Sequence, residues 1–412
     1  MRDLRTTESA AQAWVSSLRI TSLFQPVVDL HTGDVVGFEA LTRGPAGGSM
    51  ESPAALFAAA AERRAVAELD WSCRTTALRG ALEANLPTSL HLFLNMEPST
   101  MDMSPPPEVR DVLDDSTGLS ITVEITERDL LSDPGGLLRS VAHARELGWR
   151  IAVDDVGADP ASLAFLPFLR PDVIKLDMRL VQNRSDADTA MTVMAVAAES
   201  DRTGAAVLAE GIETDQHLRA AREMGATLGQ GWLFGKPAPL AAYPGIDTAP
   251  TIPVASVPAS VTARVPAAVT PFGMASAVRK NRRGSSFVVS TIMDQLRRGA
   301  LAVAPTTICL TTVPNAVRDA HGSDALLSEN CALYAMFGAG PADSAVRRVF
   351  LHPDEPLAGE WSFVVVNPHF AAAVVALQDA DGQFAFCLTY DRTLVLAVAS
   401  LLLFRLPRAP TH

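Results

Sequence analysis

The run Trp149-Arg150-Ile151-Ala152-Val153-Asp154-Asp155 places two adjacent carboxylates at the end of a short apolar stretch. A short run of this kind, bounded by polar residues, predicts a strand buried on both faces of a parallel sheet. Neighbouring strand residues point to opposite faces, so both aspartates can reach one site only where the strand opens into a loop. A bound cation keeps two such close carboxylates ionised, whereas one aspartate alone would be explained as a helix N-cap.

Further polar residues end similar apolar runs along the first 240 residues, and helical patterns separate most of these runs. The first two runs, 23–30 and 35–41, flank Gly33-Asp34 and predict a β-hairpin. In a (β/α)8 barrel all strand C-termini meet at one rim, whereas an open doubly wound sheet gathers only the loops near its switch point. We therefore predict an α/β protein with a (β/α)8-like (TIM) barrel, whose rim carries Glu39, Asn95, Glu124, Asp154, Asp155, Lys175, Glu210 and Gln230.

This predicted rim is rich in the oxygen ligands that hard divalent cations prefer. It holds five carboxylates and the amide oxygen of Asn95, while no histidine in the chain has the spacing of a metal ligand. Five carboxylates suit a pair of Mg²⁺ or Mn²⁺ ions roughly 3.5–4 Å apart, which would activate water and stabilise the leaving oxygen of a phosphodiester. Lys175 and Arg43 would supply positive charge for an anionic substrate.

The composition indicates a globular, alanine-rich protein of 412 residues, long enough for two domains. The net charge of −12 argues against a nucleic-acid-binding surface. The N-terminus lacks the pattern of a signal peptide, and the most apolar run, 394–404, is about half the ~20 residues of a membrane span, so it predicts a buried helix. The four cysteines form no CxxC pair and suggest buried thiols in a reducing compartment. We expect a cytoplasmic protein.

Composition also divides the chain. We expect a leader segment over 1–19, the barrel over 20–240, and a linker over 241–270 that is rich in proline, alanine and valine. Globular patterning resumes at residue 271 and predicts a smaller mixed α/β domain up to residue 412, with a terminal helix from about Leu394.

Residues 20–240 resemble the EAL domain, the family of cyclic di-GMP phosphodiesterases. The resemblance is carried by seven motifs in order: Glu39-Ala40-Leu41-Thr42-Arg43 preceded by Gln25-Pro26, then Phe93-Leu94-Asn95, Val123-Glu124-Ile125-Thr126-Glu127, Asp154-Asp155-Val156-Gly157, Ile174-Lys175-Leu176-Asp177, Ala209-Glu210-Gly211-Ile212-Glu213 and Gly229-Gln230-Gly231. The family fold is a (β/α)8-like barrel, in agreement with the prediction above.

The resemblance implies hydrolysis of cyclic di-GMP to linear pGpG at two Mg²⁺ or Mn²⁺ ions, and a homodimer. It implies metal ligands at Glu39, Asn95, Glu124 and Asp154, with Asp155 shared with or adjacent to them. Lys175 would position or deprotonate the attacking water, Glu210 and Gln230 would complete the metal and water shell, and Arg43 would hold a phosphate. The remaining implied residues are Gln25, Leu41 and Lys236 at the substrate, and Glu127, Asp177 and Glu213 as supports of the ligands; an ordinary first-turn glutamate is the alternative for Glu127 and Glu213.

The sequence departs from the family pattern after the paired aspartates. Where the family reads Asp-Phe-Gly-Thr-Gly-Tyr-Ser-Ser-Leu, this chain has Asp159 and Pro160 in place of the second glycine and the tyrosine. In the family this loop arranges the aspartates and contacts the dimer partner. A stiffer loop supports an alternative function, a cyclic di-GMP receptor without turnover. A further alternative is hydrolysis of a different phosphodiester.

Residues 271–412 resemble, by pattern more than by motif, the DICT sensory domain found beside cyclic di-GMP enzymes. The features are Phe287-Val288-Val289-Ser290 leading into a helix, the strand Phe363 to Val366, and the apolar terminal helix. The resemblance implies regulation of the barrel by a small-molecule or protein signal. The alternative is a packing or dimerisation module without a ligand.

Overall fold

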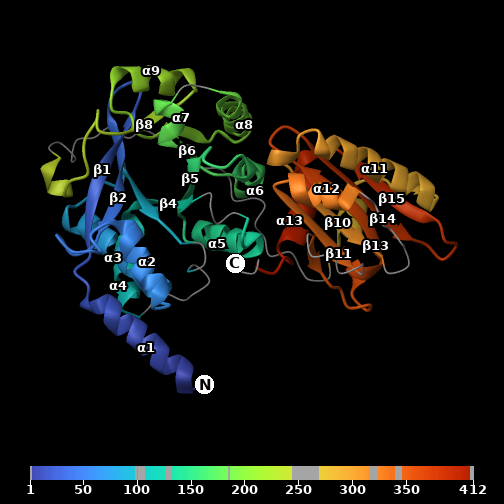
Figure 1. Cartoon of the computed structure of the whole chain (residues 1–412), viewed down its shortest axis with the longest axis horizontal. Coiled ribbons are helices and arrows are strands. Elements are labelled where there is room, and N and C mark those ends of the chain that lie inside the picture. The colour runs from blue at the N-terminus through green and yellow to red at the C-terminus, as the bar shows by residue number, and fades with distance from the viewer. Residues whose placement is uncertain are drawn as a thin grey trace.

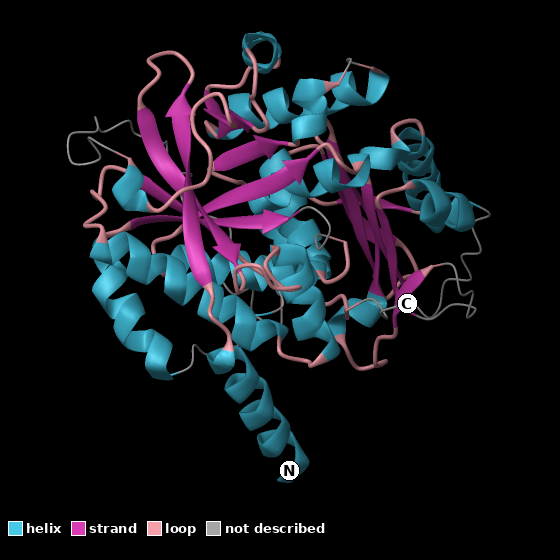
Figure 2. Cartoon of the chain, turned by 60° about the vertical axis from the view of Figure 1, so that its left-hand side comes forward, coloured by secondary structure: helices cyan, strands magenta, loops and turns pink. Residues whose placement is uncertain are grey.

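The computed structural model describes residues 2–97, 100, 107–126, 131–183, 186–243, 269–314, 323–338 and 346–408. Its first unit is a closed eight-stranded barrel, as the sequence predicts (Figures 1 and 2). The strands are β1 (Thr21–Asp29), β2 (Val35–Arg43), β3 (His91–Asn95), β4 (Ser120–Thr126), β5 (Arg150–Val156), β6 (Val173–Leu176), β7 (Ala206–Ala209) and β8 (Leu228–Gln230).

The predicted hairpin is β1–β2, and it makes the barrel depart from an all-parallel one. β1 runs antiparallel to both β2 and β8, while neighbouring strands from β2 to β8 are parallel. The helices of this unit are α1 (Arg2–Ser17), α2 (Pro53–Glu62), α3 (Val66–Glu83), α4 (Pro107–Asp115), α5 (Pro134–Glu146), α6 (Leu166–Leu169), α7 (Met178–Gln182), α8 (Ala187–Thr203) and α9 (Asp215–Glu223). The segment predicted as a leader is mostly α1, whose Ala11 and Val15 are buried in one apolar cluster with Leu56 and Leu69.

The barrel interior below the rim is an apolar layer that includes Phe93, Ala152, Val173, Leu208 and Leu228. Side chains two residues apart in a strand share a face. The residue two positions after each of these apolar side chains therefore points toward the same barrel axis, one layer nearer the strand C-termini. These residues are Asn95, Asp154, Lys175, Glu210 and Gln230. This period of two explains why polar residues at separate strand ends converge on one mouth.

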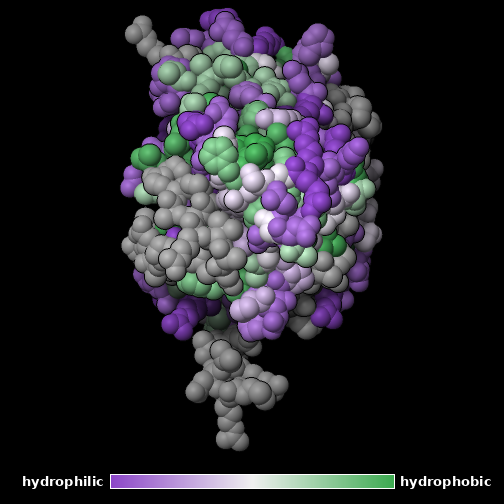
Figure 3. Space-filling view, turned by 90° about the vertical axis from the view of Figure 1, so that its right-hand side faces the viewer, coloured by the Kyte–Doolittle hydropathy of each residue, from purple (hydrophilic) through white to green (hydrophobic). Residues whose placement is uncertain are grey.

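The second unit is a seven-stranded sheet in the order β12-β11-β10-β13-β14-β15-β9. The structure gives α10 (Pro271–Val278), β9 (Arg282–Gly284), α11 (Ser286–Leu301), β10 (Ile308–Val313), α12 (Ser323–Asn330), β11 (Leu333–Gly338), β12 (Arg347–Val349), β13 (Glu360–Val366), β14 (Ala371–Gln378), β15 (Phe384–Thr389) and α13 (Arg392–Leu403). Residues 287–290 lie inside α11 and do not precede a helix as the pattern suggested. The outer face of this unit has an apolar centre framed by hydrophilic side chains (Figure 3).

The two faces of this sheet belong to different cores. Phe363 and Val365 pack in a cluster with Val289 and Met293 of α11. The alternate strand residues and α13 share a second cluster with the barrel helices. The predicted buried helix at 394–404 is α13, and it lies between the sheet and the barrel. Its apolar character all round follows from burial on both sides.

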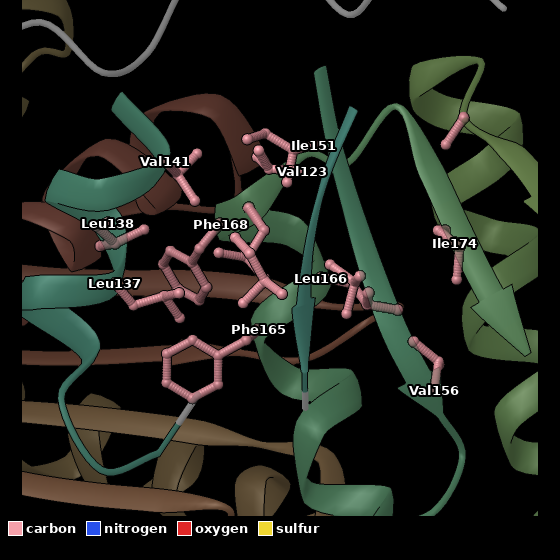
Figure 4. Packing of buried hydrophobic residues seen from close by; sticks show 14 of the residues in the cluster. Val123, Leu137, Leu138, Val141, Ile151, Val156, Phe165, Leu166, Phe168 and Ile174 are labelled. Atoms are coloured by element: carbon pink, nitrogen blue, oxygen red, sulfur yellow. The ribbon is translucent and has the colours of Figure 1, made fainter. Parts of the chain in front are cut away.

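The contact between the units includes Leu137 and Leu138 of α5 and Phe165 and Phe168 around α6, which belong to the same apolar core as α13 (Figure 4). The backbones also approach closely: a Cβ on Gly135 would lie 3.1 Å from the carbonyl oxygen of Leu403. The second unit therefore packs directly against the barrel segments that follow β4 and β5.

Most of the predicted linker, 244–268, lies outside the described residues. The three residues before it belong to the barrel, since the Tyr243 hydroxyl donates to the carbonyl oxygens of Phe24 (2.9 Å) and Lys236 (2.6 Å). Its ring lies 5.0 Å from that of Phe38. No helix within the described ranges is long and apolar enough to cross a bilayer.

Candidate active site

The paired aspartates reach one site through a break in β5. The pairing of β5 with β6 shifts register between Val153 and Val156, and Asp155 between them adopts a left-handed conformation with φ of 56°. This turn removes the usual alternation of faces. Carboxylate oxygens of Asp154, Asp155 and Glu210 consequently lie within 4.8 Å of one another, a spacing that can hold a metal ion.

The left-handed conformation of Asp155 makes a stability prediction. Asparagine tolerates positive φ, whereas a β-branched side chain is strained there by roughly 1–2 kcal/mol. In urea denaturation we expect the free energy of unfolding of Asp155→Asn to lie within about 0.5 kcal/mol of the wild-type value. That of Asp155→Val should be lower because of the additional strain. Equal stability of the two variants in metal-free buffer would show that the backbone at this position is unstrained.

Lys175 lies at the centre of the rim and is completely buried. Its Nζ is 2.7 Å from Glu124 Oε1, 2.9 Å from Asp154 Oδ1, 2.9 Å from Glu210 Oε1 and 3.8 Å from Glu39 Oε2. Burying one ammonium costs several kcal/mol, which close carboxylates on several sides offset. One lysine cannot balance this many carboxylates, so the site keeps an excess of negative charge for cations.

Two amides and Glu39 form the other half of the rim. Glu39 accepts hydrogen bonds from Asn95 Nδ2 (3.3 Å) and Gln230 Nε2 (2.5 Å). Gln230 Nε2 also donates to Gln25 Oε1 (3.2 Å), and Gln25 in turn donates to the carbonyl oxygen of Gly235 (3.0 Å). Both amides thus point their NH₂ groups at acceptors inside the protein, which fixes where their oxygens point.

The residues present fit a divalent cation. Glu124 Oε2 and Gln230 Oε1 are buried and have no hydrogen-bond partner among the described residues. Buried polar oxygens are rarely left unsatisfied. Carboxylate and amide oxygens of this kind, at the same rim as the Asp154, Asp155 and Glu210 group, are the ligands that Mg²⁺ and Mn²⁺ prefer.

Burial also perturbs the acids of the rim. It raises the pKa of Glu124 well above its usual range and that of Glu210 to about 8, although Lys175 opposes the latter shift. For Lys175 burial would lower the pKa, but Asp154, Glu124 and Glu210 raise it well above its ordinary value. Lys175 therefore stays protonated at neutral pH.

Because the pKa of Glu210 is raised, we expect the stability of the metal-free protein and its affinity for metal to change with pH in opposite directions. Its neutral form stabilises the fold, and this contribution is lost as pH rises through about 8. Metal binding requires the ionised form and strengthens over the same range. We expect the increase in Tm caused by Mg²⁺ over EDTA to be larger at pH 9 than at pH 6.5. An increase that shrinks with pH would contradict this assignment.

Other predicted residues lie away from this centre. Asp177 caps α7 and accepts from the Arg179 backbone N–H (2.7 Å) and Nε (2.9 Å). Glu213 is exposed and precedes Thr214, the N-cap of α9. Glu127 is outside the described residues. Leu41 and Arg43, at the end of β2, are both partly exposed.

Two features of the site escaped the sequence analysis. Trp232, two residues after Gln230, is 58% exposed, and Lys236 Nζ lies 4.6 Å from the centre of its ring. Asp70 of α3 is buried, pairs with Arg74 (2.5 Å) and accepts from the backbone N–H of Glu97, two residues past Asn95. Asp70 and Arg74 lie four residues apart in a predicted helix, and this spacing could have predicted their ion pair.

The altered loop after Asp155 is an ordered helical turn. Asp159 caps the 3₁₀ helix Pro160–Phe165 by accepting from the backbone N–H of Ala161 (2.9 Å), and Pro160 occupies its first turn. Aspartate at the cap and proline next to it are favoured there. The end of this turn, Phe165, packs in the core shared with the second unit. The loop that contacts a dimer partner in the family pattern thus contacts the chain's own second unit.

A closed (β/α)8-like barrel with polar and acidic side chains at its strand C-termini is the architecture on which barrel enzymes place their active sites. Comparison with known proteins identifies the family. Residues 8–237 match the model of the EAL domain, and the chain belongs to the EAL domain family.

Similar proteins carry names that refer to cyclic di-GMP. The chain is 29% identical to the cyclic di-GMP phosphodiesterase RocR of Pseudomonas aeruginosa, over 52% of this chain and 57% of that protein. It is 29% identical to the probable cyclic di-GMP phosphodiesterase PdeG of Escherichia coli, over 56% of this chain and 47% of that protein. The structure of Klebsiella pneumoniae BlrP1 in complex with manganese and cyclic di-GMP is similar over 53% of this chain and 56% of that chain, with 30% identity and a TM-score of 0.46. The chain thus covers less than two thirds of each of these proteins.

Proposed function

We propose that the protein hydrolyses cyclic di-GMP to linear pGpG with two Mg²⁺ or Mn²⁺ ions, and that the second unit regulates this activity. The observation that carries the proposal is the convergence of Glu39, Glu124, Asp154 and Glu210 on Lys175 at one mouth of the barrel. Membership of the EAL domain family supports it.

In this proposal Glu39, Asn95, Glu124, Asp154 and Asp155 hold the ions, and Glu210 and Gln230 complete the metal and water shell. When bound, the ions would activate water and neutralise the leaving oxygen. Lys175 positions the attacking water by donating a hydrogen bond. Its raised pKa argues against a role as the base that deprotonates water, because a base must first be neutral.

The substrate would lie across the mouth between the end of β2 and the loop after β8. Arg43 and Lys236 offer positive charge there, and Leu41 lies two residues before Arg43 on β2. Gln25 is buried and accepts a hydrogen bond from Gln230, so it would act from the edge of the mouth. Lys236 stands over Trp232, which presents an exposed aromatic face next to Gln230. Aromatic faces stack well on nucleobases, which fits a dinucleotide substrate.

Arg43→Ala is expected to weaken substrate binding more than catalysis. A charge-assisted hydrogen bond contributes roughly 1.5–3 kcal/mol, which corresponds to about a 10- to 100-fold increase in KM for cyclic di-GMP. Steady-state kinetics should show kcat changed by less than about threefold. Arg19→Ala, an exposed arginine near β1, is the control. A fall in kcat alone would assign Arg43 a different role.

Turnover tests the main proposal. The purified 412-residue chain is incubated with cyclic di-GMP and Mn²⁺, and the nucleotides are separated by chromatography. Formation of pGpG supports hydrolysis of cyclic di-GMP by this protein. If no pGpG forms at micromolar protein, the proposed hydrolysis is rejected. Tight binding with unchanged nucleotide would select the receptor alternative, which the altered turn at Asp159 and Pro160 favours.

The proposed regulation is based on hydrogen bonds between the second unit and barrel segments that follow strands of the active site. Arg347 of β12 donates to the carbonyl oxygens of Leu131 (3.0 Å) and Ser132 (3.2 Å), just before α5. Arg202 of α8 donates to the carbonyl oxygen of Pro368 (3.3 Å) in the second unit. These segments follow β4 and β6, which carry Glu124 and Lys175. A DICT-like unit that receives a small-molecule or protein signal could act through them.

Gly135 allows a direct test of this coupling. A larger side chain there meets the backbone of Leu403 and Phe404, so Gly135→Leu should wedge the units apart. Gly299→Leu is the matched control, because a Cβ on this helical glycine meets nothing within 4 Å. Regulation predicts that kcat changes severalfold in the first variant and not in the second. Identical kinetics in folded samples of both would remove the regulatory role.

The homodimer and the cytoplasmic location remain predictions.

A further inference from the structure

The backbone that follows β3 is held from two sides. Asn95 is the last residue of β3 and lies opposite Glu124 of β4. The next backbone N–H, that of Met96, donates to the carbonyl oxygen of Glu124 (3.0 Å). The N–H of Glu97 donates instead to Oδ1 of Asp70 in α3 (3.2 Å). The chain leaves the sheet between these two hydrogen bonds, so they define the backbone just beyond Asn95.

Asp70 belongs to a network that is closed to solvent. Asp70, Arg74 and Thr100 are each at most 2% exposed. Arg74 Nη2 lies 2.5 Å from Asp70 Oδ2 and 3.2 Å from Thr100 Oγ1. Thr100 Oγ1 in turn lies 2.5 Å from Asp70 Oδ2 and 2.8 Å from the carbonyl oxygen of Glu97. Both carboxylate oxygens of Asp70 therefore have donors, and two of these donors belong to the segment after β3.

A buried acid–base pair four residues apart could simply stabilise α3. Such a pair contributes little net stability, because desolvation of both charges offsets their attraction. Stabilising the helix also requires no contact outside it, whereas Asp70 accepts from the backbone of Glu97, 27 positions further along the chain. The α3 helix lies between β2 and β3 in the chain, so its first turns lie near the strand C-termini. The network thus connects α3 to the rim of the barrel.

Asn95 is the rim residue that depends most on such support. Of the eight polar residues of the rim it alone is exposed. Among the described residues its side chain makes one hydrogen bond, a long one of 3.3 Å to Glu39 Oε1. An exposed side chain with one weak contact is positioned mainly by its backbone, because its own rotamers are otherwise free.

We propose that Asp70 is a positioning residue of the active site, which acts with Arg74 and Thr100 by holding the backbone after β3 and, through it, the Asn95 amide. The inference rests on the proposed function in taking Asn95 as a metal ligand. Groups that orient metal ligands commonly contribute about 10- to 100-fold to metal affinity. Asp70 itself is buried in α3, so its effect passes through the backbone to Asn95.

The first test asks whether the pair holds the backbone, in the absence of metal. Asp70→Leu with Arg74→Met removes both charges together, and such replacements often leave stability unchanged. It also removes the acceptor of the Glu97 N–H. In EDTA, hydrogen exchange measured by mass spectrometry should be faster than in the wild type for peptides that contain Met96 and Glu97, while the Tm stays close to the wild-type value. Unchanged exchange in these peptides would overturn the proposal.

Calorimetric titration with Mn²⁺ tests the link to the rim. The affinity of the double variant should fall about 10-fold or more. In an Asn95→Ala background the same double substitution should change the affinity by less than about twofold, because the residue through which it acts is absent. Unchanged affinity in the double variant, or a further 10-fold loss in the Asn95→Ala background, would overturn this inference alone. A wild-type chain that binds no Mn²⁺ would overturn the proposed function and the inference together.

Thr100→Val is a second variant that leaves both charges in place. It removes the hydroxyl between Asp70 and the carbonyl oxygen of Glu97, and should weaken Mn²⁺ binding about two- to tenfold, the effect of one hydrogen bond. Thr75→Val is the matched control, because this buried hydroxyl donates within α3 to the carbonyl oxygen of Trp71 (2.7 Å). Equal Mn²⁺ affinities of these two variants would overturn the proposal, also where the double variant does not fold.

Discussion

Lys175→Met is expected to lose turnover and a large part of the stability of the barrel. The substitution keeps the volume of the side chain but removes the cation that lies within 3 Å of Glu124, Asp154 and Glu210. Removing one partner of a buried ion pair costs about 3–5 kcal/mol, because the remaining charges stay buried and uncompensated. In EDTA the Tm should therefore fall by several degrees or more.

The same variant should recover stability when Mg²⁺ is added, because a divalent cation can neutralise the carboxylates that Lys175 leaves behind. Thermal unfolding with and without metal measures both effects. Lys280→Met, an exposed lysine in the second unit, is the control and should behave like the wild type. A Lys175→Met protein with wild-type Tm in EDTA would mean that the carboxylates do not depend on this ammonium.

Glu39→Ala is expected to reduce turnover by at least about 100-fold and to weaken metal binding. Glu39 accepts from both amides of the rim, Asn95 and Gln230, so its loss removes an anion and also releases the side chains that it holds in place. Even residues that only orient metal ligands contribute about 10- to 100-fold to affinity or activity. A ligand should contribute no less.

Calorimetric titration of Mn²⁺ into Glu39→Ala measures the metal effect, and chromatography of pGpG measures turnover. Glu39→Gln serves as a second variant that retains the shape and some hydrogen bonding but not the charge. Glu62→Ala, on the exposed side of α2, is the matched control. Metal affinity and turnover that survive in Glu39→Ala would exclude Glu39 as a ligand.

The barrel and the composition of its rim were predictable because both depend on short periods in the sequence. Apolar runs that end in polar residues fix the strand C-termini, and the period of two then aims Asp154 and Glu210 at one axis. The need for a loop at the paired aspartates was also predictable. The positive φ of Asp155 was not predictable, because this conformation depends on the register shift between β5 and β6.

Other features depend on contacts between distant parts of the chain. The central position of Lys175 depends on four strands meeting around it. The substitutions Asp159 and Pro160 suggested a stiffer loop, but only the fold gives them a capped 3₁₀ turn whose end packs against the second unit.

Anomalous X-ray diffraction from crystals grown with Mn²⁺ and cyclic di-GMP would show directly whether the acidic side chains of the rim bind a pair of metal ions. We expect two strong peaks at the barrel mouth, with a phosphate of the nucleotide beside them. Both should lie within bonding distance of oxygens from Glu39, Glu124, Asp154, Asp155 and their neighbours. Manganese bound only elsewhere, or a mouth without anomalous signal at saturating Mn²⁺, would contradict it.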